Sequence, residues 1–376
     1  MNKKKILHVA NLVGGVEVCI RQIINNIDHS KIISLVASQP LNGKEKILNS
    51  DQKEVKVLKI PIQREINLFR DIVCFFKLLR IIKTENPDLI HAHSAKAGVL
   101  CRVASKFIDI QVFYTPHAFS FLSAQNKLLK KLYLNIERFT ISKRTLIVAT
   151  SESEMKLAIN EVGYKAKNTF VLKNAIKIET ILKSRSEITK GIEDYICTVA
   201  RPSFQKNLEM LINVFKIVSK NDQNLHLFIL GAGEYSPQKD HIKKLITKEG
   251  LNKRATITPW ISRNEVQKIL MHSKLYVSTS RYEGLPYSVL ESMRFRVPAV
   301  LTNCFGHKDL IVENKTGFLV KLNQTNIMAK KILELTSDQV KREKFGHCAY
   351  ELLNKRHNFE EYIETLTNLY LKLSKN

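Results

Sequence analysis

The sequence lacks long hydrophobic runs and any regular arrangement of metal-ligating residues. No stretch approaches the roughly 18 consecutive apolar residues that a transmembrane helix requires, so none is expected. The six cysteines are scattered, without CxxC spacing and without histidines at metal-ligand intervals, which predicts buried free thiols in a reducing cytoplasm. There is no Asp-x-Asp pair to hold a divalent cation, no low-complexity segment and no repeat.

The N-terminal segment MNKKKILHVANLVGG places three lysines before an apolar run, as a secretion signal does. His8 and Asn11 interrupt this run, and Gly14-Gly15 end it without a cleavage site. The segment is therefore expected to form a first buried strand followed by a glycine turn. A cytoplasmic protein is predicted.

Positive charge is in large excess, with a net charge of +25, and it is unevenly distributed. Residues 1–177 carry 29 Lys and Arg against 14 Asp and Glu, and the remaining residues carry 31 against 21. Anionic partners are therefore expected, more strongly for the first half. Nucleic acid, an anionic membrane and diphosphate-bearing substrates all satisfy this expectation, and charge alone does not choose among them.

Short strand-like runs alternate with helical stretches, which is typical of parallel α/β sheets built from crossovers. The strands expected in the first half are KILHVAN, ISLVAS, VKVLKI, LIHAHS, QVFYTPH and TLIVATS. A second series follows with YICTVA, LHLFILG, ATITPW, LYVSTS and PAVLTN. We therefore predict an α/β fold with two Rossmann-like, doubly wound domains, residues 1–180 and 190–355. The polar stretch 178–194 is the expected hinge, and the segment 356–376 the expected C-terminal helix.

Two glutamates follow the strand LYVSTS. Glu283 lies in the expected loop at the carboxyl end of that strand, where such sheets bind ligands, and Gly284-Leu285-Pro286 starts a helix that contains Glu291. Both carboxylates can accept hydrogen bonds from sugar and ribose hydroxyls. Taken alone, a helix-capping glutamate and a solvated glutamate also explain this spacing.

Two cations lie in VARPSFQKN, between an expected strand and an expected helix. Arg201 and Lys206, together with the free N–H groups of the helix that runs from Asn207, form a diphosphate site that needs no metal. A pair of solvated surface cations is the alternative. Gly231 and Gly233, in ILGAGEY, lie in another turn at the end of an expected strand. This turn either lies beneath a bound nucleotide or is simply a tight turn.

The first half offers further candidates at strand ends. Gly14-Gly15 lets the backbone approach a ligand closely, although such turns are common. His91 and His93 lie in LIHAHS and His117 in YTPHAFSF; for His91 a structural role is expected. Lys96 lies at the start of an expected helix. It is either a solvated lysine or a contact to the diphosphate of an acceptor, the molecule that would receive a transferred group.

Residues 280–320 resemble the EGxPxxxxE region of retaining glycosyltransferases of family 4, which have the two-domain GT-B fold. VARPSFQKN is similar to the diphosphate-clamping segment of that family. HSAKAG followed by YTPHAFSF resembles its bacterial capsule, exopolysaccharide and O-antigen subgroup. The resemblance runs from Gly14 to the final helix. Two departures are visible: Arg296 in FRVP replaces a glycine, and Gly306 alone remains of a glycine pair, which bears on the shape of the sugar pocket.

The resemblance implies a role for each candidate residue. Glu283 contacts the donor sugar and Glu291 holds the ribose, while Arg201 and Lys206 stabilise the departing diphosphate. His117 faces the donor sugar. The remaining residues implied at the donor are Gly14, Gly15, Gly231, Gly233, Gly284 and Leu285.

The implied reaction is transfer of a sugar, an N-acetylhexosamine or hexose, from a UDP-sugar to a lipid-diphosphate-linked saccharide, with retention of configuration. No metal and no other cofactor is expected. The first domain binds the acceptor and the second the donor, facing a cleft, with the segment 356–376 packed on the first domain. Because no carboxylate is placed as a nucleophile, front-face attack by the acceptor hydroxyl is expected. A UDP-sugar epimerase on the same frame, or a non-catalytic basic protein that binds membrane or nucleic acid, is the alternative.

The segment 126–144 is expected to form an amphipathic helix. Its apolar residues, Leu128, Leu129, Leu132, Ile136 and Phe139, recur at helical spacing beside many lysines and arginines. Such a helix can lie on an anionic bilayer, or its apolar stripe can pack against the domain core. In either case the basic face predicts peripheral association with the inner face of the cell membrane, and no nucleic acid partner is expected.

Overall fold

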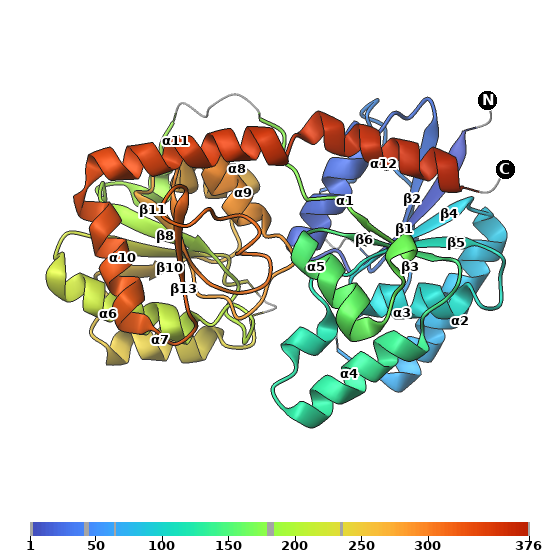
Figure 1. The fold of residues 1–376 in the computed structure, drawn as a ribbon, viewed down its shortest axis with the longest axis horizontal. Helices are drawn as coiled ribbons and strands as arrows, with labels where there is room; N and C mark the ends of the chain where they lie inside the picture. Colours follow the sequence, from blue (N-terminus) through green and yellow to red (C-terminus); the bar gives the residue numbers. More distant parts are fainter. Residues whose placement is uncertain (1–2, 41–44, 64, 179–183, 234–235, 375–376) are drawn as a thin grey trace. The chain divides into compact units, whose positions relative to one another are not determined.

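The computed structural model describes residues 3–40, 45–63, 65–178, 184–233 and 236–374. The chain forms two compact units, each built around its own sheet (Figure 1). The first unit comprises Met1–Asn174 and Phe359–Asn376, and the second comprises Ala175–Asn358. Within the expected hinge, residues 179–183 lie outside the described residues.

The first unit contains a seven-stranded sheet in the order β3-β2-β1-β4-β5-β6-β7, and every strand pair described in it is parallel. The order reverses between β1 and β4, which makes their carboxyl ends the topological switch point where such sheets bind ligands. The strands are β1 (Lys4–Val9), β2 (Ile32–Ser38), β3 (Val57–Lys59), β4 (Leu89–His93), β5 (Gln111–Thr115), β6 (Thr145–Ala149) and β7 (Thr169–Val171).

Helices cover this sheet, and one of them comes from the end of the chain. The helices are α1 (Gly15–Asn26), α2 (Leu68–Glu85), α3 (Ala95–Ala104), α4 (Lys127–Phe139), α5 (Glu152–Leu157) and α12 (Phe359–Leu373). α12 packs against β1, and Figure 1 shows it in red beside α1 in blue. Tyr370 of α12 is fully buried, so the C-terminal helix is part of the core of the first unit.

The second unit contains a six-stranded sheet in the order β10-β9-β8-β11-β12-β13, again parallel throughout the described pairs. Its order reverses between β8 and β11, which places a second switch point there. The strands are β8 (Tyr195–Val199), β9 (His226–Leu230), β10 (Ala255–Ile257), β11 (Leu275–Ser278), β12 (Ala299–Thr302) and β13 (Gly317–Val320).

Several helices of the second unit contribute to a shared hydrophobic core with its sheet. The helices of this unit are α6 (Leu208–Asn221), α7 (Lys239–Lys248), α8 (Arg263–Met271), α9 (Tyr287–Arg294), α10 (Thr325–Ser337) and α11 (Gln339–Arg356). Those that contribute to the core are α6, α7, α10 and α11. In α6, Leu208, Leu211, Phe215 and Val218 recur at spacings of three and four residues and are all buried. This periodicity turns one face of the helix onto the sheet, and burial of that face stabilises the unit.

The α/β class and the doubly wound arrangement are confirmed, and each strand segment predicted from the sequence contains a strand. The sequence analysis missed β7 and β13, two strands of three and four residues at sheet edges. Segments this short carry too few residues to show a period. The expectation that all cysteines are buried was wrong for Cys304 and Cys348, which are partly exposed; all six are free thiols.

Candidate active site

Two loops lie side by side at the switch point of the second sheet. The first, residues 200–207, follows β8 and leads into α6, and the second, residues 279–286, follows β11 and leads into α9. β8 and β11 are parallel neighbours, so both loops leave the same edge of the sheet. Thr279 Oγ1 joins them by donating hydrogen bonds to the backbone carbonyls of Lys206, at 3.1 Å, and Asn207, at 2.9 Å. The acidic and basic segments found in the sequence are therefore adjacent.

Glu283 is buried at this point, and the opposite loop holds its carboxylate. Lys206 Nζ lies 2.6 Å from Oε1, and Gln205 Nε2 donates to Oε2 at 3.2 Å. Burial by itself would raise the pKa of the Glu283 carboxyl, but Lys206, together with His307 and Ser280, more than offsets this and the pKa is lowered. The site therefore presents an ionised acceptor group. Gln205 lies in the quoted basic motif, but the sequence analysis did not single it out.

The backbone around Glu283 is packed tightly against Gly306. Glu283 N donates to the carbonyl of Phe305 at 3.0 Å. Gly306 has a φ of 83°, and a Cβ at this position would lie 2.6 Å from the carbonyl oxygen of Gly284. Both the left-handed conformation and the close approach require glycine here. Leu285, the next residue of the turn, is buried shortly before the start of α9.

Glu291 lies on α9 and is also buried. Its Oε1 accepts a hydrogen bond from Arg263 of α8 at 3.0 Å. Burial raises the pKa of the Glu291 carboxyl, and the nearby Arg263 counteracts this only in part. The two glutamates therefore differ, since Glu283 is held ionised to lower pH than Glu291. Arg263 was not identified from the sequence because it lies far away in the chain, on a helix without a motif.

Arg201 is half-buried, and no hydrogen bond or ion pair to another described residue occupies it. Asn207 precedes α6 in a left-handed conformation, and within the described chain no side chain caps this helix, so its first N–H groups remain available to an anion. Gly231, after the neighbouring strand β9, has a φ of 104°, which favours glycine. At Gly233 a Cβ would make only ordinary contact with Trp260. The rest of that turn, residues 234–235, lies outside the described residues.

The departure at Arg296 has a structural consequence that the sequence did not indicate. Arg296 has a φ of 58°, so the position after α9 requires the left-handed conformation that glycine adopts without strain. Its guanidinium lies over the ring of Tyr350 on α11, 4.9 Å from the ring centre. The Arg296 side chain therefore packs on α11. Of the two positions that depart from the family pattern, Gly306 is the one that contacts the Glu283 loop.

His307 is a buried residue of this site that the sequence analysis missed. Its Nδ1 donates to the carbonyl of Thr302 at 2.9 Å. In the neutral ring Nε2 then carries no proton and is a hydrogen-bond acceptor. This Nε2 is buried without a hydrogen-bond partner in the described part of the chain. Burial lowers the pKa of His307 to about 4, and Glu283 is near enough to counteract this in part. A signal was present in the sequence, because His307 follows Gly306 in the loop after the predicted strand PAVLTN.

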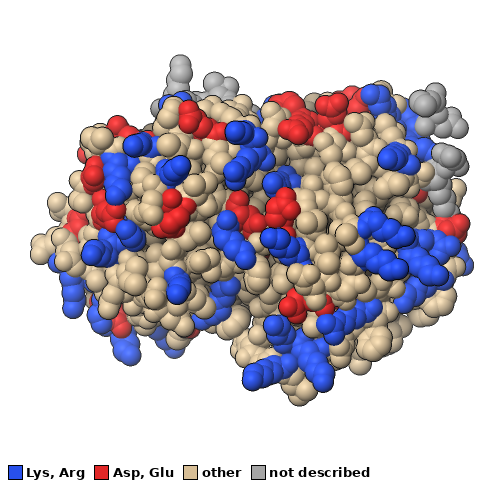
Figure 2. Space-filling view, in the orientation of Figure 1, with Lys and Arg blue, Asp and Glu red and all other residues tan. Residues whose placement is uncertain are grey.

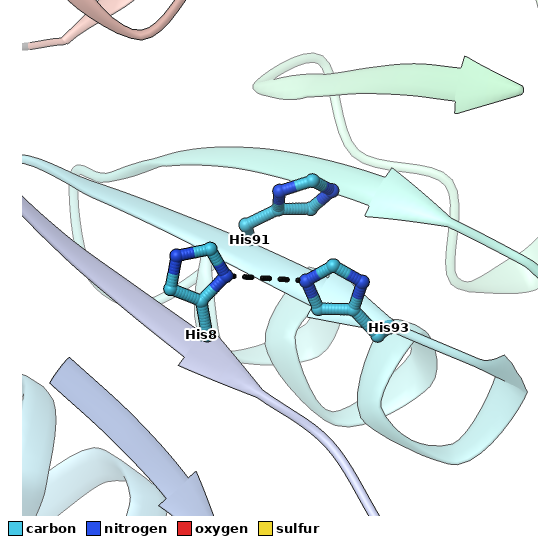
Figure 3. A group of neighbouring side chains, drawn as sticks. All are labelled: His8, His91 and His93. Carbon is cyan, nitrogen blue, oxygen red and sulfur yellow. Dashed lines mark hydrogen bonds between the residues drawn. The ribbon is translucent and has the colours of Figure 1, made fainter. Parts of the chain in front are cut away.

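The first unit gathers histidines at its own switch point. His8 on β1 and His91 on β4 are register partners, and His93 follows two residues later on the same face of the sheet (Figure 3). His91 is a satisfied core residue: Nε2 bonds to Thr115 Oγ1 at 2.9 Å and Nδ1 bonds to the hydroxyl of Tyr370. The other two rings bond to each other, with 3.2 Å between His8 Nδ1 and His93 Nε2.

His117 lies in the loop after β5, within reach of His93. His93 Nδ1 and His117 Nε2 are 3.2 Å apart. His117 and Ala118 have φ values of 51° and 79°, which non-glycine residues rarely adopt. The buried Glu154 holds this loop by accepting from the N–H of Ala118 at 2.7 Å. Backbone strain maintained in this way is often found at functional sites.

One ring nitrogen from each of His8, His91 and His93 lies within 4.8 Å of the other two, a set that is chemically able to ligate a transition metal. Five of their six nitrogens already have partners among the described residues, and only His8 Nε2 does not. A metal would have to replace these hydrogen bonds. Hydrogen bonding accounts for the arrangement better than ligation does.

Two other candidates of the first unit have different surroundings. Gly14 precedes α1 with a φ of 61°, and a Cβ there would meet nothing within 4 Å, so the turn borders open space. Lys96, expected to be either solvated or free for an acceptor, is neither. Its ammonium bonds to Asp71 Oδ1 at 2.7 Å and to the carbonyl of Glu65. The ammonium is therefore held by groups of the first unit, and its contact to an acceptor diphosphate stays a prediction.

Comparison with known proteins agrees with this geometry. Residues 180–352 match the family described as glycosyl transferases group 1, and residues 13–180 match glycosyltransferase family 4. The chain is a GT-B glycosyltransferase of family 4. The segment that carries Arg201, Lys206, Glu283 and Glu291 falls wholly within the first match.

Relatives of this glycosyltransferase include bacterial proteins named for capsular polysaccharide and O-antigen biosynthesis. The chain is 26% identical to the UDP-Gal:alpha-D-GlcNAc-diphosphoundecaprenol alpha-1,3-galactosyltransferase of Escherichia coli, over 85% of this chain and 84% of that protein. It is 25% identical to the capsular polysaccharide biosynthesis glycosyltransferase CapM of Staphylococcus aureus, over 94% and 98%. Its fold is similar to that of Anabaena Alr3699/HepE in complex with UDP-glucose, with a TM-score of 0.79, 18% identity and coverage of 98% and 99%.

Proposed function

We propose that this glycosyltransferase moves an N-acetylhexosamine or hexose from a UDP-sugar to a lipid-linked saccharide, with retention of configuration, in the synthesis of a bacterial surface polysaccharide. One observation carries the proposal: at the switch point of the second sheet, Lys206 lies 2.6 Å from the buried Glu283, with Arg201 and the start of α6 on the same loop. This set combines groups for a sugar hydroxyl with groups for a diphosphate.

Each donor role follows from charge and position. Glu283 is acceptor-only and ionised, so it accepts hydrogen bonds from hydroxyls of the donor sugar. Arg201, Lys206 and the α6 N-terminus stabilise the negative charge that develops on the departing diphosphate. Glu291 accepts from the ribose, next to Arg263. We assign the turns at Gly231, Gly233, Gly284 and Leu285 to the donor as well. For Gly14, Gly15 and His117 the proposed contact to the donor rests on the resemblance of their motifs.

Retention without a covalent intermediate is the mechanism that these residues favour. A nucleophilic carboxylate would need a free oxygen, yet both oxygens of Glu283 accept hydrogen bonds from the opposite loop. In Glu291, Oε1 accepts a hydrogen bond from Arg263. The acceptor hydroxyl is therefore proposed to attack on the face from which the diphosphate departs. Lys206 and Arg201 supply the positive charge that a divalent cation supplies in other transferases.

The donor and acceptor classes are supported by relatives. The fold neighbour HepE binds UDP-glucose, and the Escherichia coli relative transfers galactose from UDP-Gal to a diphosphoundecaprenol-linked sugar. We extend both classes to this chain as UDP-sugar and lipid-diphosphate-linked saccharide. An acceptor of this kind lies in a membrane, which requires the enzyme to reach the bilayer surface.

The reaction is tested by measuring UDP release from a set of UDP-sugars in the presence of lipid-diphosphate-linked saccharides. We expect release with one donor only when acceptor is present, product formation with the α-configuration of the donor retained, and the same rate in excess EDTA. Interconversion of UDP-sugars without transfer would instead indicate an epimerase. Activity that EDTA abolishes and that magnesium or manganese restores would contradict the metal-free mechanism.

Membrane association is proposed because α4 exposes apolar side chains. Leu128 and Phe139 are 80% and 79% exposed, and Leu132 is also exposed, whereas Leu129 and Ile136 are partly buried. The alternative that the whole stripe packs on the core is therefore wrong for its outer half. In the described chain no helix is both long and apolar enough to span a bilayer. Contact at the surface is what this helix permits.

The inner face of α4 is held by buried hydrogen bonds. The apolar side chains on its outer face therefore do not belong to the hydrophobic core. Glu137 is buried, where Oε2 pairs with Arg102 at 2.7 Å and Oε1 accepts from Tyr114 at 3.0 Å. Breaking a buried pair of this kind costs about 3–5 kcal/mol. The helix is therefore held to the first unit while its other face remains in solvent.

The exposed apolar surface continues from α4 to α2. Phe107, beyond α3, packs its ring on Phe75 of α2, which also contacts the exposed Phe76. Lys106, beside Phe107, donates to the carbonyl of Phe139 at 2.9 Å. Further along α2, the exposed apolar residues are Leu68, Phe69 and Ile72. Figure 2 shows Lys and Arg side chains over α4, which suits an anionic surface.

Liposome sedimentation tests this surface. Replacing Lys127, Lys130 and Lys131 with Glu is expected to weaken binding to anionic vesicles by about two orders of magnitude, since each cation contributes about 1 kcal/mol. Binding of the unmodified protein is expected to fall with added salt. The matched control replaces Lys243, Lys244 and Lys248, exposed lysines on α7 of the second unit, and should change little. Equal binding to neutral and anionic vesicles would exclude α4 as the docking surface.

A further inference from the structure

Three imidazoles form a continuous file from the core of the first unit to the loop after β5. His8 Nδ1 and His93 Nε2 are 3.2 Å apart, and so are His93 Nδ1 and His117 Nε2. Successive rings are stacked, with centroids 5.5 Å apart in both pairs. Figure 3 shows the inner part of the file, with His8 and His93 joined across two neighbouring strands. His93 therefore connects the other two rings.

Each ring in the file is neutral. Burial lowers the pKa of His8 to about 3 and that of His117 to about 4, and it lowers the pKa of His93 well below the usual value. A neutral imidazole has one N–H donor and one acceptor nitrogen. Each of the two bonds needs one donor and one acceptor, so the three tautomers are coupled. Only two arrangements satisfy both bonds, one with all protons directed outwards and one with all directed inwards.

The inner end of the file selects between these arrangements. His8 Nε2 is buried and has no hydrogen-bond partner in the described part of the molecule. In the inward arrangement this nitrogen would carry an unpaired N–H, and in the outward arrangement an unpaired lone pair; either costs free energy when buried. Buried N–H groups without a partner are rarer in proteins than buried acceptors without one, which favours the outward arrangement. In the outward arrangement the protons of His8 and His93 lie on Nδ1, and both are used in the file. His117 then accepts at Nε2 and carries its own proton on Nδ1.

We propose that His93, supported by His8, is a positioning residue that fixes His117 in the Nδ1–H tautomer and thereby makes it a hydrogen-bond donor to substrate. The part of this inference that concerns substrate rests on the proposed function of His117 at the donor sugar. With Nε2 occupied by His93 and Nδ1 protonated, His117 has no free lone pair. It donates to a sugar oxygen and does not act as a base.

The backbone of His117 is fixed together with its ring. The left-handed conformations at His117 and Ala118 turn the loop, and Glu154 retains them through the N–H of Ala118 and the N–H and hydroxyl of Thr150. A donor that is held at both backbone and ring loses little freedom when substrate binds. Pre-organisation of this kind is what a contact to a bound sugar requires.

The tautomers can be observed directly in the full-length protein labelled with ¹⁵N-histidine. Long-range ¹H–¹⁵N spectra, assigned with single histidine variants, are expected to show Nδ1 protonated in His8, His93 and His117. A proton on Nε2 of His117 would overturn the relay. A transition metal retained in stoichiometric amount, with His8 and His93 signals that shift on its removal, would replace the relay by a metal site.

Two substitutions of His93 separate positioning from packing. Asparagine places an amide donor near the position of Nδ1 and can keep the bond to His117, whereas phenylalanine keeps the ring shape and the stacking but no hydrogen bond. We expect His93→Asn to retain the Nδ1–H tautomer of His117 and His93→Phe to lose it. The donor KM should rise up to about tenfold in His93→Phe and less in His93→Asn, as expected for loss of one hydrogen bond.

A purely structural role predicts the opposite order, since phenylalanine fills the buried space better than asparagine. Unchanged donor KM in His93→Phe, with the expected tautomers in the unmodified protein, would overturn the proposed role of His117 at the donor while the relay itself stands. Thermal unfolding of both variants shows whether either is misfolded. His8→Phe removes the bond between His8 and His93 but leaves the bond between His93 and His117 in place. It should therefore affect the His117 tautomer less than His93→Phe does.

Discussion

Replacing Lys206 with alanine is expected to lower kcat/KM by about two to three orders of magnitude, the effect of removing one group that stabilises developing charge. Lys206 also keeps the buried Glu283 ionised. Without the ammonium, burial is opposed only by the weaker effects of His307 and Ser280, so the pKa of that carboxyl rises. The carboxylate is then protonated at a higher pH, so the acid limb of the residual activity is expected to move to higher pH.

Arg201→Ala is the matched comparison. Arg201 has no partner among the described residues, so its removal is expected to slow the reaction by a similar factor without moving the acid limb. Initial rates of UDP release as a function of pH distinguish the two variants. If Lys206→Ala retained nearly full activity, or if both variants shifted the acid limb equally, the division of roles would be incorrect.

Glu283→Gln is expected to reduce turnover by about two orders of magnitude with the fold intact. Hydrogen bonds that involve a charged group contribute about 1.5–3 kcal/mol each, and the amide replaces one acceptor oxygen by a donor. That donor faces Lys206 or Gln205, both of which are donors themselves. The measurement is kcat with saturating donor, with thermal unfolding as the check on folding.

Two neighbouring substitutions make this result specific. Gln205→Ala removes a neutral donor from the same carboxylate and should cost only a few-fold in rate, since a neutral hydrogen bond contributes about 0.5–1.5 kcal/mol. Glu291→Ala should weaken UDP binding chiefly, because its carboxylate lies with Arg263 and not with Lys206. Near-normal turnover in Glu283→Gln, or a change in acceptor affinity alone in Glu291→Ala, would contradict the assigned roles.

The position of the donor site could be predicted because it depends on local order along the chain. A buried strand that ends in a glycine or proline turn before a helix leaves its loop at the carboxyl edge of a parallel sheet. Glu283 after LYVSTS and Lys206 after YICTVA are both of this kind. Their side chains meet because β8 and β11 are neighbours, which the sequence analysis did not establish.

Partners distant in sequence could not be predicted in this way. Arg263 bonds to Glu291 from another helix, and Asp71 of α2 takes up Lys96. The exposed half of the α4 stripe is a similar case, because the sequence shows an apolar face but not which part of it a neighbouring element covers. At Arg296 the sequence showed the unusual residue but not its consequence. The arginine in place of glycine was visible in the sequence, whereas the left-handed backbone that strains a non-glycine residue there was not.

The sequence by itself determined the α/β class, the two strand series and the residue types at their ends, since periodicity and turn chemistry act over a few residues. Only the tertiary structure decided which strand ends are neighbours, that Lys206 rather than Arg201 neutralises Glu283, and that His8, His93 and His117 form one file. These contacts join residues 77, 85 and 24 positions apart. Packing brings such residues together, and no short-range pattern in the chain records it.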